Sequence, residues 1–204
     1  MILQALVLLV ARPAAKTTIA YDFRGFGRPE RPAIEVRVTE RIDAVHPDGT
    51  LKTSRLYTNI VQKGGVAMKG IESIAGKRDH FTVGPTGEWV QTTPNIELGF
   101  PDFPFPATSV PIGHTWDPGR NLRGVQARLK ETRTIAGHRV AVIDFPALSN
   151  VEGRDRIGPG SYWVTDLADG RPLFARLELV DKNPADSAVF TIVRRGIPGL
   201  VPKL

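Results

Sequence analysis

Apolar and polar residues alternate along most of this chain. The pattern is clear in IEVRVTE (34–40) and returns in VQARLK (125–130) and LFARLEL (173–179). A period of two is typical of a β-strand that buries one face and exposes the other. The alternation therefore predicts an antiparallel sheet with one face toward the core.

Glycine turns separate these strands. HPDG (46–49), GPTG (84–87) and LADG (167–170) each stand between two alternating runs, as in β-hairpins. The run Lys52–Gln62 is one such strand, with Leu56, Thr58 and Ile60 expected on one face. Val66–Gly76 has apolar residues close to helical spacing, but its glycines limit it to a short helix or a loop.

We therefore expect an all-β protein. About nine or ten strands would form a curved antiparallel sheet, an open or half barrel, with at most one or two short helices. Glycine and proline, 20 and 17 of 204 residues, fit many turns between short strands.

A proline- and phenylalanine-rich connector divides the chain. It covers Phe100–Pro118, with the sequence FPDFPFPATSVPIGHTWDP. Residues 16–204 are predicted to form a single β-rich domain of two similar halves, about 30–99 and 119–195, on either side of this connector. Internal duplication would explain the likeness of the halves, and so would the ordinary repetition of hairpins in an antiparallel sheet.

The N-terminus carries a short apolar run, Ile2–Ala11. A membrane-spanning helix needs about 20 such residues, whereas the apolar region of a secretory signal needs only about 7–15. Residues 1–15 are interpreted as an incomplete signal peptide, although they lack a basic start. The alternative is an N-terminal strand or helix buried in the fold. The first interpretation predicts a periplasmic or extracellular protein, and the second is compatible with the cytoplasm.

Charge and cysteine content exclude several classes. The net charge is +6, but the longest basic runs are doublets such as Lys77-Arg78 and Arg194-Arg195. Nucleic-acid binders usually concentrate basic residues in a stripe or tail, so none is expected as a partner. The absence of cysteine excludes disulfides, thiolate zinc sites and a cysteine nucleophile.

No catalytic motif stands out. The four histidines, His46, His80, His114 and His138, lack the spacing of a helical zinc site. No serine lies in a G-x-S-x-G motif, and no glycine pair continues into a phosphate loop. We expect no metal, no cofactor and no enzymatic activity. A hydrolase whose site is invisible in the sequence is kept as an alternative.

Aromatic residues are the candidates for a ligand site. Pockets for apolar ligands are lined by apolar and aromatic side chains. The connector and the two hairpins carry six such candidates: Phe100, Phe103, Phe105, Trp116, Trp89 and Trp163. The alternative is that the connector wraps the sheet and buries its phenylalanines as ordinary core.

The order of elements resembles a known family. A hairpin FTVGPTGEWV precedes the proline-rich segment, and the unit Gly113-His114-Thr115-Trp116 follows it. The chain continues with RLKETRTIAGHRVAVIDF and the hairpin SYWVTDLADGRPLFARLEL. This series resembles exported bacterial proteins with a LolA/LolB-like open β-barrel, including uncharacterised relatives.

The resemblance implies a sheet curved around an apolar cavity that helices close. Characterised proteins of that fold carry lipoprotein acyl chains, and others bind lipids. Here one helical segment is visible where a lid needs more, and no ligand-binding residue can be transferred by motif. The predicted function is non-enzymatic binding of a lipid or other apolar small molecule by an exported protein. The alternative is an envelope module that binds a protein or glycan through its sheet surface.

Overall fold

The described residues of the computed structural model form strands joined by turns. These residues are 6–9, 13–27, 31–63, 75–92, 105–118, 125–146, 156–157, 160–180, 187–198 and 200. Their strands are β1 (Leu6–Val7), β2 (Thr18–Gly27), β3 (Arg31–Val45), β4 (Leu51–Gln62), β5 (Arg78–Val83), β6 (Trp89–Thr92), β7 (Val110–Pro111), β8 (Thr115–Trp116), β9 (Ala127–Ile135), β10 (His138–Asp144), β11 (Arg156–Ile157), β12 (Tyr162–Asp166), β13 (Pro172–Val180) and β14 (Ala188–Arg194).

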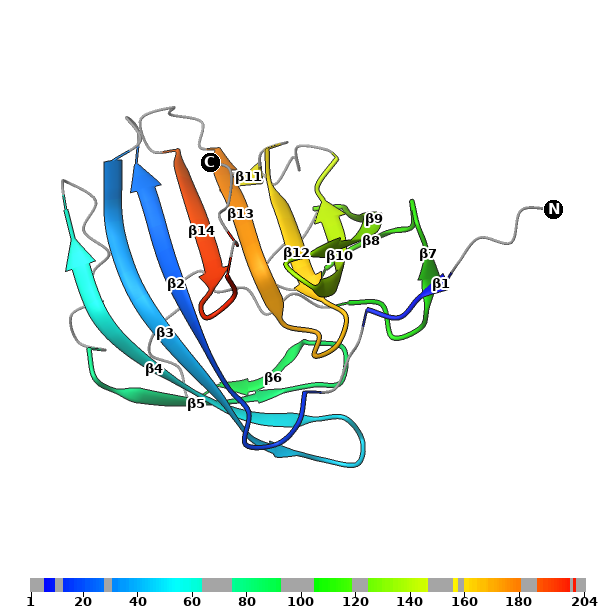
Figure 1. Cartoon of the computed structure of the whole chain (residues 1–204), viewed down its shortest axis with the longest axis horizontal. Coiled ribbons are helices and arrows are strands. Elements are labelled where there is room, and N and C mark those ends of the chain that lie inside the picture. The colour runs from blue at the N-terminus through cyan, green and yellow to red at the C-terminus, as the bar shows by residue number, and fades with distance from the viewer. Residues whose placement is uncertain are drawn as a thin grey trace.

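Twelve of the strands make one antiparallel sheet, which Figure 1 shows as a curved surface. Its order is β6-β5-β4-β3-β2-β14-β13-β12-β10-β9-β8, and β11 pairs with β13. Without the two-residue strands β8 and β11, ten strands remain. The prediction of an all-β fold with a curved, open antiparallel sheet is confirmed.

The sheet consists of two meanders, β2 to β6 and β8 to β14, whose outer ends are joined by the connector. β2 and β14 pair in the middle of the sheet, so strands from the beginning and end of the described chain lie side by side (Figure 1). β6 and β8 are the two edges. The chain leaves one edge at β6 and reaches the other at β8, so residues 93–114, which include most of the predicted connector, link the two edges.

The two faces of the sheet bury different side chains. One face, here called the inner face, carries Tyr21, Val38 and Trp163 and the residues in phase with them. Its buried apolar residues form the inner core: Ile19, Tyr21, Phe23, Ile34, Val36, Val38, Tyr57, Val125, Ala127, Ile143, Phe145, Trp163, Ala175, Leu177 and Ile192. This core explains the alternation in the sequence, because one residue in two points into it.

Two smaller clusters complete the packing. The first, here called the N-terminal cluster, consists of Val7, Leu9, Val110, Leu129 and Ala141. β1 pairs with β7, so residues 6–7 lie against the connector. The second lies around Val164 and Phe174, and Ile197 and Leu200 from the C-terminal segment pack against it.

Strand β4 differs from the expected pattern. Leu56, Thr58 and Ile60 are half-buried, whereas Arg55 and Tyr57 are 1% exposed and belong to the inner face. In this part of the strand Arg55 and Tyr57 are therefore the buried residues, and not the three even-numbered residues that the apolar pattern indicates. The pattern misleads because the buried position 55 holds a charged residue. Residues 66–74 of the predicted helical segment lie outside the described residues.

Gly25 marks a close contact within the inner core. A Cβ atom placed there would lie 2.7 Å from Cγ2 of Ile34 and 3.0 Å from Cε1 of Phe190. Gly25→Ala is therefore expected to lower the free energy of unfolding by about 1–3 kcal/mol through overpacking. Urea melts check it. In a double-mutant cycle with Phe190→Leu, we expect the two costs to be less than additive; strict additivity would contradict the contact.

Candidate ligand-binding face

The inner face is apolar over most of its width. The inner core takes residues from β2, β3 and β4 on one side of the sheet and from β9, β10 and β12 on the other. Phe23 and Phe190 stack within it, with ring centroids 5.6 Å apart. The apolar side chains of the inner core, 0–6% exposed, form the main core of the molecule.

Two aromatic residues of the connector lie near opposite edges of the sheet. The Phe105 N–H donates to the Thr86 carbonyl in the β5–β6 turn, with N and O 2.7 Å apart. Trp116 lies in β8 at the opposite edge, paired with Ala127. Phe105 and Trp116 are both half-buried and pack against the inner core and the N-terminal cluster. Here this pair is called the seam.

The structure places three of the six predicted aromatic residues on this face. Trp163 is 2% exposed inside the inner core, opposite Ile143 and Ala175. Phe105 and Trp116 form the seam. Trp89 lies in β6, but its side chain is outside the described residues, as are Phe100 and Phe103. Trp163 is core, whereas the seam residues keep part of their surface exposed.

One end of the inner face is charged instead of apolar. Glu40 on β3 is 1% exposed and stands opposite Ile19 and Arg55. Arg55 Nε donates to Glu40 Oε2 at 2.8 Å, and Arg171 Nη2 lies 3.2 Å from Glu40 Oε1. The Arg55 guanidinium also lies over the Phe81 ring, 5.0 Å from its centroid. A buried carboxylate held by two arginines is satisfied electrostatically.

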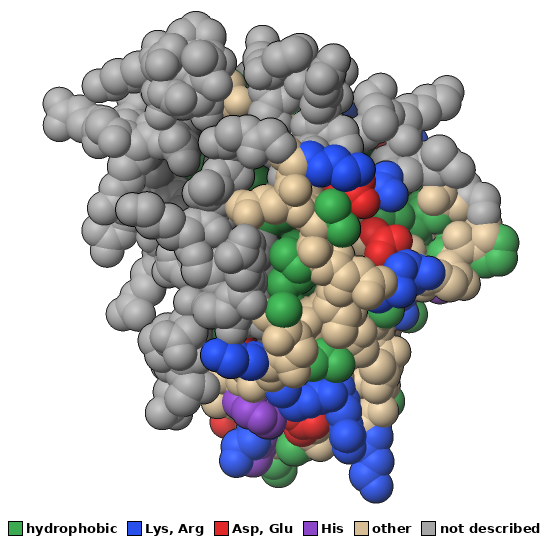
Figure 2. Space-filling view, turned by 90° about the vertical axis from the view of Figure 1, so that its left-hand side faces the viewer, with side chains coloured by type: hydrophobic (Ala, Val, Ile, Leu, Met, Phe, Trp, Pro, Cys, Tyr) green, Lys and Arg blue, Asp and Glu red, His purple; other side chains and the backbone are tan. Residues whose placement is uncertain are grey.

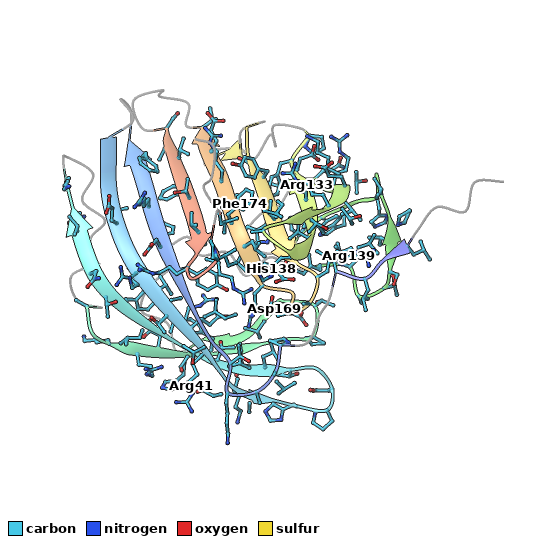
Figure 3. The ribbon with its side chains drawn as sticks, viewed as in Figure 1. Arg41, Arg133, His138, Arg139, Asp169 and Phe174 are labelled. Carbon is cyan, nitrogen blue, oxygen red and sulfur yellow. The ribbon has the colours of Figure 1, made fainter. Side chains whose placement is uncertain are left out.

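A second group of charges continues this arrangement across the β12–β13 turn. Arg194 Nη1 on β14 lies 2.8 Å from Asp169 Oδ2 and 3.7 Å from Asp166 Oδ2. His138 Nδ1 on β10 lies 2.6 Å from the same Asp166 oxygen. Figure 3 labels His138 and Asp169, which lie near one another at the lower ends of these strands. The two groups together, here called the charge cluster, contain three arginines, three carboxylates and His138.

Burial and charge shift two titratable groups beside this cluster. Burial raises the pKa of Tyr21, and Glu40 raises it further, so this phenol stays protonated. Burial alone would also raise the pKa of Glu40, but Arg171 and Arg55 outweigh it and lower that pKa. Glu40 is therefore a buried carboxylate that stays ionised at neutral pH.

The lowered pKa of Glu40 predicts acid sensitivity. The folded-state pKa lies below the ordinary value of 4.5, so ionised Glu40 stabilises the fold above that value. This stabilisation should be lost as the pH falls through the folded-state pKa. Denaturant melts on the wild type and Glu40→Gln across the acid range check it. We expect a shallower acid decline in the variant; parallel curves would show that Glu40 does not contribute.

Sequence reasoning missed the charge cluster, but one signal was present. Glu40 continues the apolar series Ile34, Val36 and Val38 with the same period of two, so the alternation places a carboxylate on the buried face. A buried carboxylate requires a partner. Arg55 and Arg171 become its neighbours only through strand register and a turn, which the sequence does not reveal.

The described residues hold no group of three or more His, Asp or Glu side chains placed to bind a metal ion. Within the same part of the chain, no helix has the length and apolarity to cross a membrane.

The fold and its inner face define the class as an open, curved antiparallel sheet. No protein-family model matches the chain, and no curated protein sequence matches it. Similar solved structures include MucB, at 13% identity and a TM-score of 0.38, over 91% of this chain and 54% of MucB. The chain thus spans about half the length of MucB, which has also been crystallised in complex with MucA(peri).

Two further structures are similar along most of their own length. A candidate lipoprotein from Parabacteroides distasonis has 13% identity and a TM-score of 0.38, over 94% of this chain and 98% of that protein. A LolA superfamily protein from Nitrosomonas europaea has 9% identity and a TM-score of 0.28, over 91% and 86%. A LolA superfamily protein is thus among the similar structures, as the sequence resemblance predicted. At these identities and TM-scores the likeness assigns no function.

Proposed function

We propose that this protein is a non-enzymatic binder of a lipid or other apolar small molecule, which it holds against the inner face at the seam. The observation that carries the proposal is the position of Phe105 and Trp116. Both are half-buried, both pack against the inner core, and they belong to a connector that joins the two edges of an open sheet. Aromatic residues in such a position offer a guest apolar area next to a preformed core.

The proposed energy source is burial of apolar surface. Fully burying an exposed aliphatic or aromatic side chain contributes about 1.5–3 kcal/mol. An acyl chain against Phe105 and Trp116 would bury the exposed parts of both rings and its own methylenes. Because this attraction is not directional, the proposal names a class of ligand and no individual lipid.

The location of the protein stays part of the proposal. Export rests on the apolar run Ile2–Ala11, read as an incomplete signal peptide. The structure adds that Val7 and Leu9 are buried in the N-terminal cluster. Sequencing the N-terminus of the protein from each cell compartment distinguishes a cleaved leader from a retained segment.

Titration with a fluorescent fatty acid tests the proposed binding. The full-length protein, prepared without detergent, is compared with Trp116→Leu and Phe105→Leu after circular dichroism has shown that each variant folds. We expect saturable binding by the wild type, weakened about tenfold in each variant because apolar contact with a ring is lost.

Ile112→Ala is the matched control. Ile112 lies on the same connector, but 46% of its surface is exposed. It is expected to bind the probe like the wild type. Absence of saturable binding by the wild type, or equal weakening in Ile112→Ala, would contradict the proposal.

A further inference from the structure

The outer side of strands β3, β4 and β5 carries a hollow of about 670 Å³. Strand register places six of its lining residues on this side, and Asp43 joins them at the bulge between Ile42 and Ala44. The six are Arg41, Lys52, Ser54, Arg78, His80 and Thr82. Figure 2 shows basic and histidine side chains gathered at the lower end of this flank of the molecule. Thr53 and Phe81, which alternate with these residues and belong to the inner side by register, also line the hollow, but no inner-core or seam residue does.

Strand register builds the hollow around Ser54. Arg41, Ser54 and His80 stand opposite one another on three neighbouring strands. Lys52 lies one step along β4, opposite Thr82, and Arg78 lies one step along β5 in the other direction. Side chains in such neighbouring positions are close enough to contact one ligand.

The cations of the hollow outnumber its carboxylates. Arg41, Lys52 and Arg78 contribute three positive charges, and Asp43, 3.3 Å from Arg41, contributes one negative charge. Among the described residues, no carboxylate forms an ion pair with Lys52 or Arg78. A surplus of positive charge in a concave surface attracts anions and concentrates them there.

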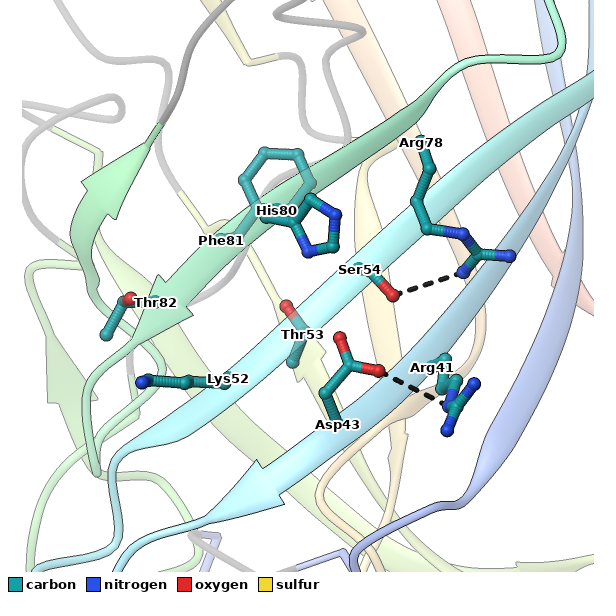
Figure 4. A pocket seen from close by; sticks show the side chains of 9 residues that line it. All are labelled: Arg41, Asp43, Lys52, Thr53, Ser54, Arg78, His80, Phe81 and Thr82. Carbon is teal, nitrogen blue, oxygen red and sulfur yellow. Dashed lines mark hydrogen bonds and ion pairs between the residues drawn. The ribbon is translucent and has the colours of Figure 1, made fainter.

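Hydrogen bonds orient part of this surface. Arg78 Nη1 donates to Ser54 Oγ at 3.1 Å, and Ser54 is 1% exposed. Figure 4 shows the Arg41 and Arg78 guanidinium groups on the same side of Ser54, with the His80 ring nearby. A guanidinium held by a buried hydroxyl presents its remaining N–H donors in a fixed direction.

We propose that this hollow binds the phosphate group of a phosphorylated ligand. Arg41, Arg78 and His80 supply N–H donors, and the Ser54 hydroxyl can donate while its oxygen accepts from Arg78. Donors on four residues match the several oxygens of a phosphate better than the two oxygens of a carboxylate. The volume leaves room for the organic part of a phosphate ester, with Lys52 toward the other end of the hollow.

Titration of the full-length protein with inorganic phosphate and with glycerol 3-phosphate tests the site. Chemical shifts of the β4 and β5 amides report where each probe binds. We expect Arg78→Gln and Arg41→Gln each to weaken binding about tenfold or more at low salt, because a charge-assisted hydrogen bond is lost. Both arginines lie on the surface, and thermal melts show that the variants fold.

Arg133→Gln is the matched control. It is an exposed arginine on β9, paired with Glu131 and absent from the lining of the hollow. Weakening confined to Arg78→Gln and Arg41→Gln supports the site. Absence of binding by the wild type, or equal weakening in all three variants, overturns it.

A vesicle assay distinguishes the two sources of phosphate. The protein is sedimented with phosphatidylcholine vesicles that contain or lack phosphatidylglycerol. Co-sedimentation that requires phosphatidylglycerol and is lost in Arg78→Gln identifies a lipid headgroup. Binding of the soluble phosphates alone identifies a free phosphate ester. Neither result depends on apolar binding at the seam, so this proposal and the proposed function fail separately.

Discussion

Replacing Glu40 with glutamine is expected to lower the free energy of unfolding by about 3–5 kcal/mol. The carboxylate is 1% exposed, accepts from Arg55 at 2.8 Å and faces Arg171 at 3.2 Å. Its removal leaves two guanidinium groups in the interior with only a neutral amide between them. An uncompensated buried charge costs far more than a lost surface ion pair. Urea denaturation at neutral pH measures the change.

The matched control is Glu131→Gln. Glu131 pairs with Arg133 on the surface of β9, where both side chains are about half exposed, and its loss should cost less than about 1 kcal/mol. If Glu40→Gln were no more costly than Glu131→Gln, the charge cluster would not be buried as the structure places it. If Glu40→Gln yields no folded protein, this result agrees with the prediction only when Glu131→Gln folds normally.

Leu9→Ala is the second substitution with a large expected effect. Leu9 is 0% exposed and packs in the N-terminal cluster with Val7, Val110 and Leu129. Truncating a fully buried leucine lowers the free energy of unfolding by about 2–5 kcal/mol through lost transfer energy and the cavity left behind. Thermal and urea melts of the chain that begins at Met1 measure it.

The neighbouring residue supplies the control. Leu8 is 52% exposed, so Leu8→Ala should change stability by no more than about 0.5 kcal/mol. Equal and small effects at both positions would show that residues 6–9 contribute nothing to the core. A large effect at Leu9 alone would show that this residue stabilises the fold. Cleavage after residue 15 would then remove part of the N-terminal cluster.

The fold class follows from the sequence because strand periodicity and turn residues are local properties. HPDG, GPTG and LADG mark three hairpin turns, and the alternating runs between such turns became β3, β4, β9 and β13. What local patterns do not contain is the pairing of β2 with β14, which joins residues about 170 positions apart. The position of the connector between two sheet edges depends on that pairing.

Buried charged residues are the second feature that local sequence patterns do not reveal. Position 55 is an arginine, so a scale of apolarity places it on the surface and shifts the inferred phase of β4. Its salt bridge with Glu40 and its contact with the Phe81 ring explain its burial. The burial of the aromatic candidates is likewise not evident from the sequence. The sequence proposes tryptophan and phenylalanine as ligand contacts, but composition alone does not separate buried Trp163 from half-buried Phe105 and Trp116.

Photo-crosslinking with a diazirine-bearing fatty acid shows whether an apolar ligand lies against the inner face at the seam. The full-length protein is irradiated with the probe, digested and mapped by mass spectrometry, with unlabelled fatty acid as competitor. We expect competable adducts on the inner side, at Phe105, Trp116 or the half-buried Phe190. Adducts confined to the outer side, at residues such as Phe174 and Tyr162, or no competable adducts at all, would contradict it.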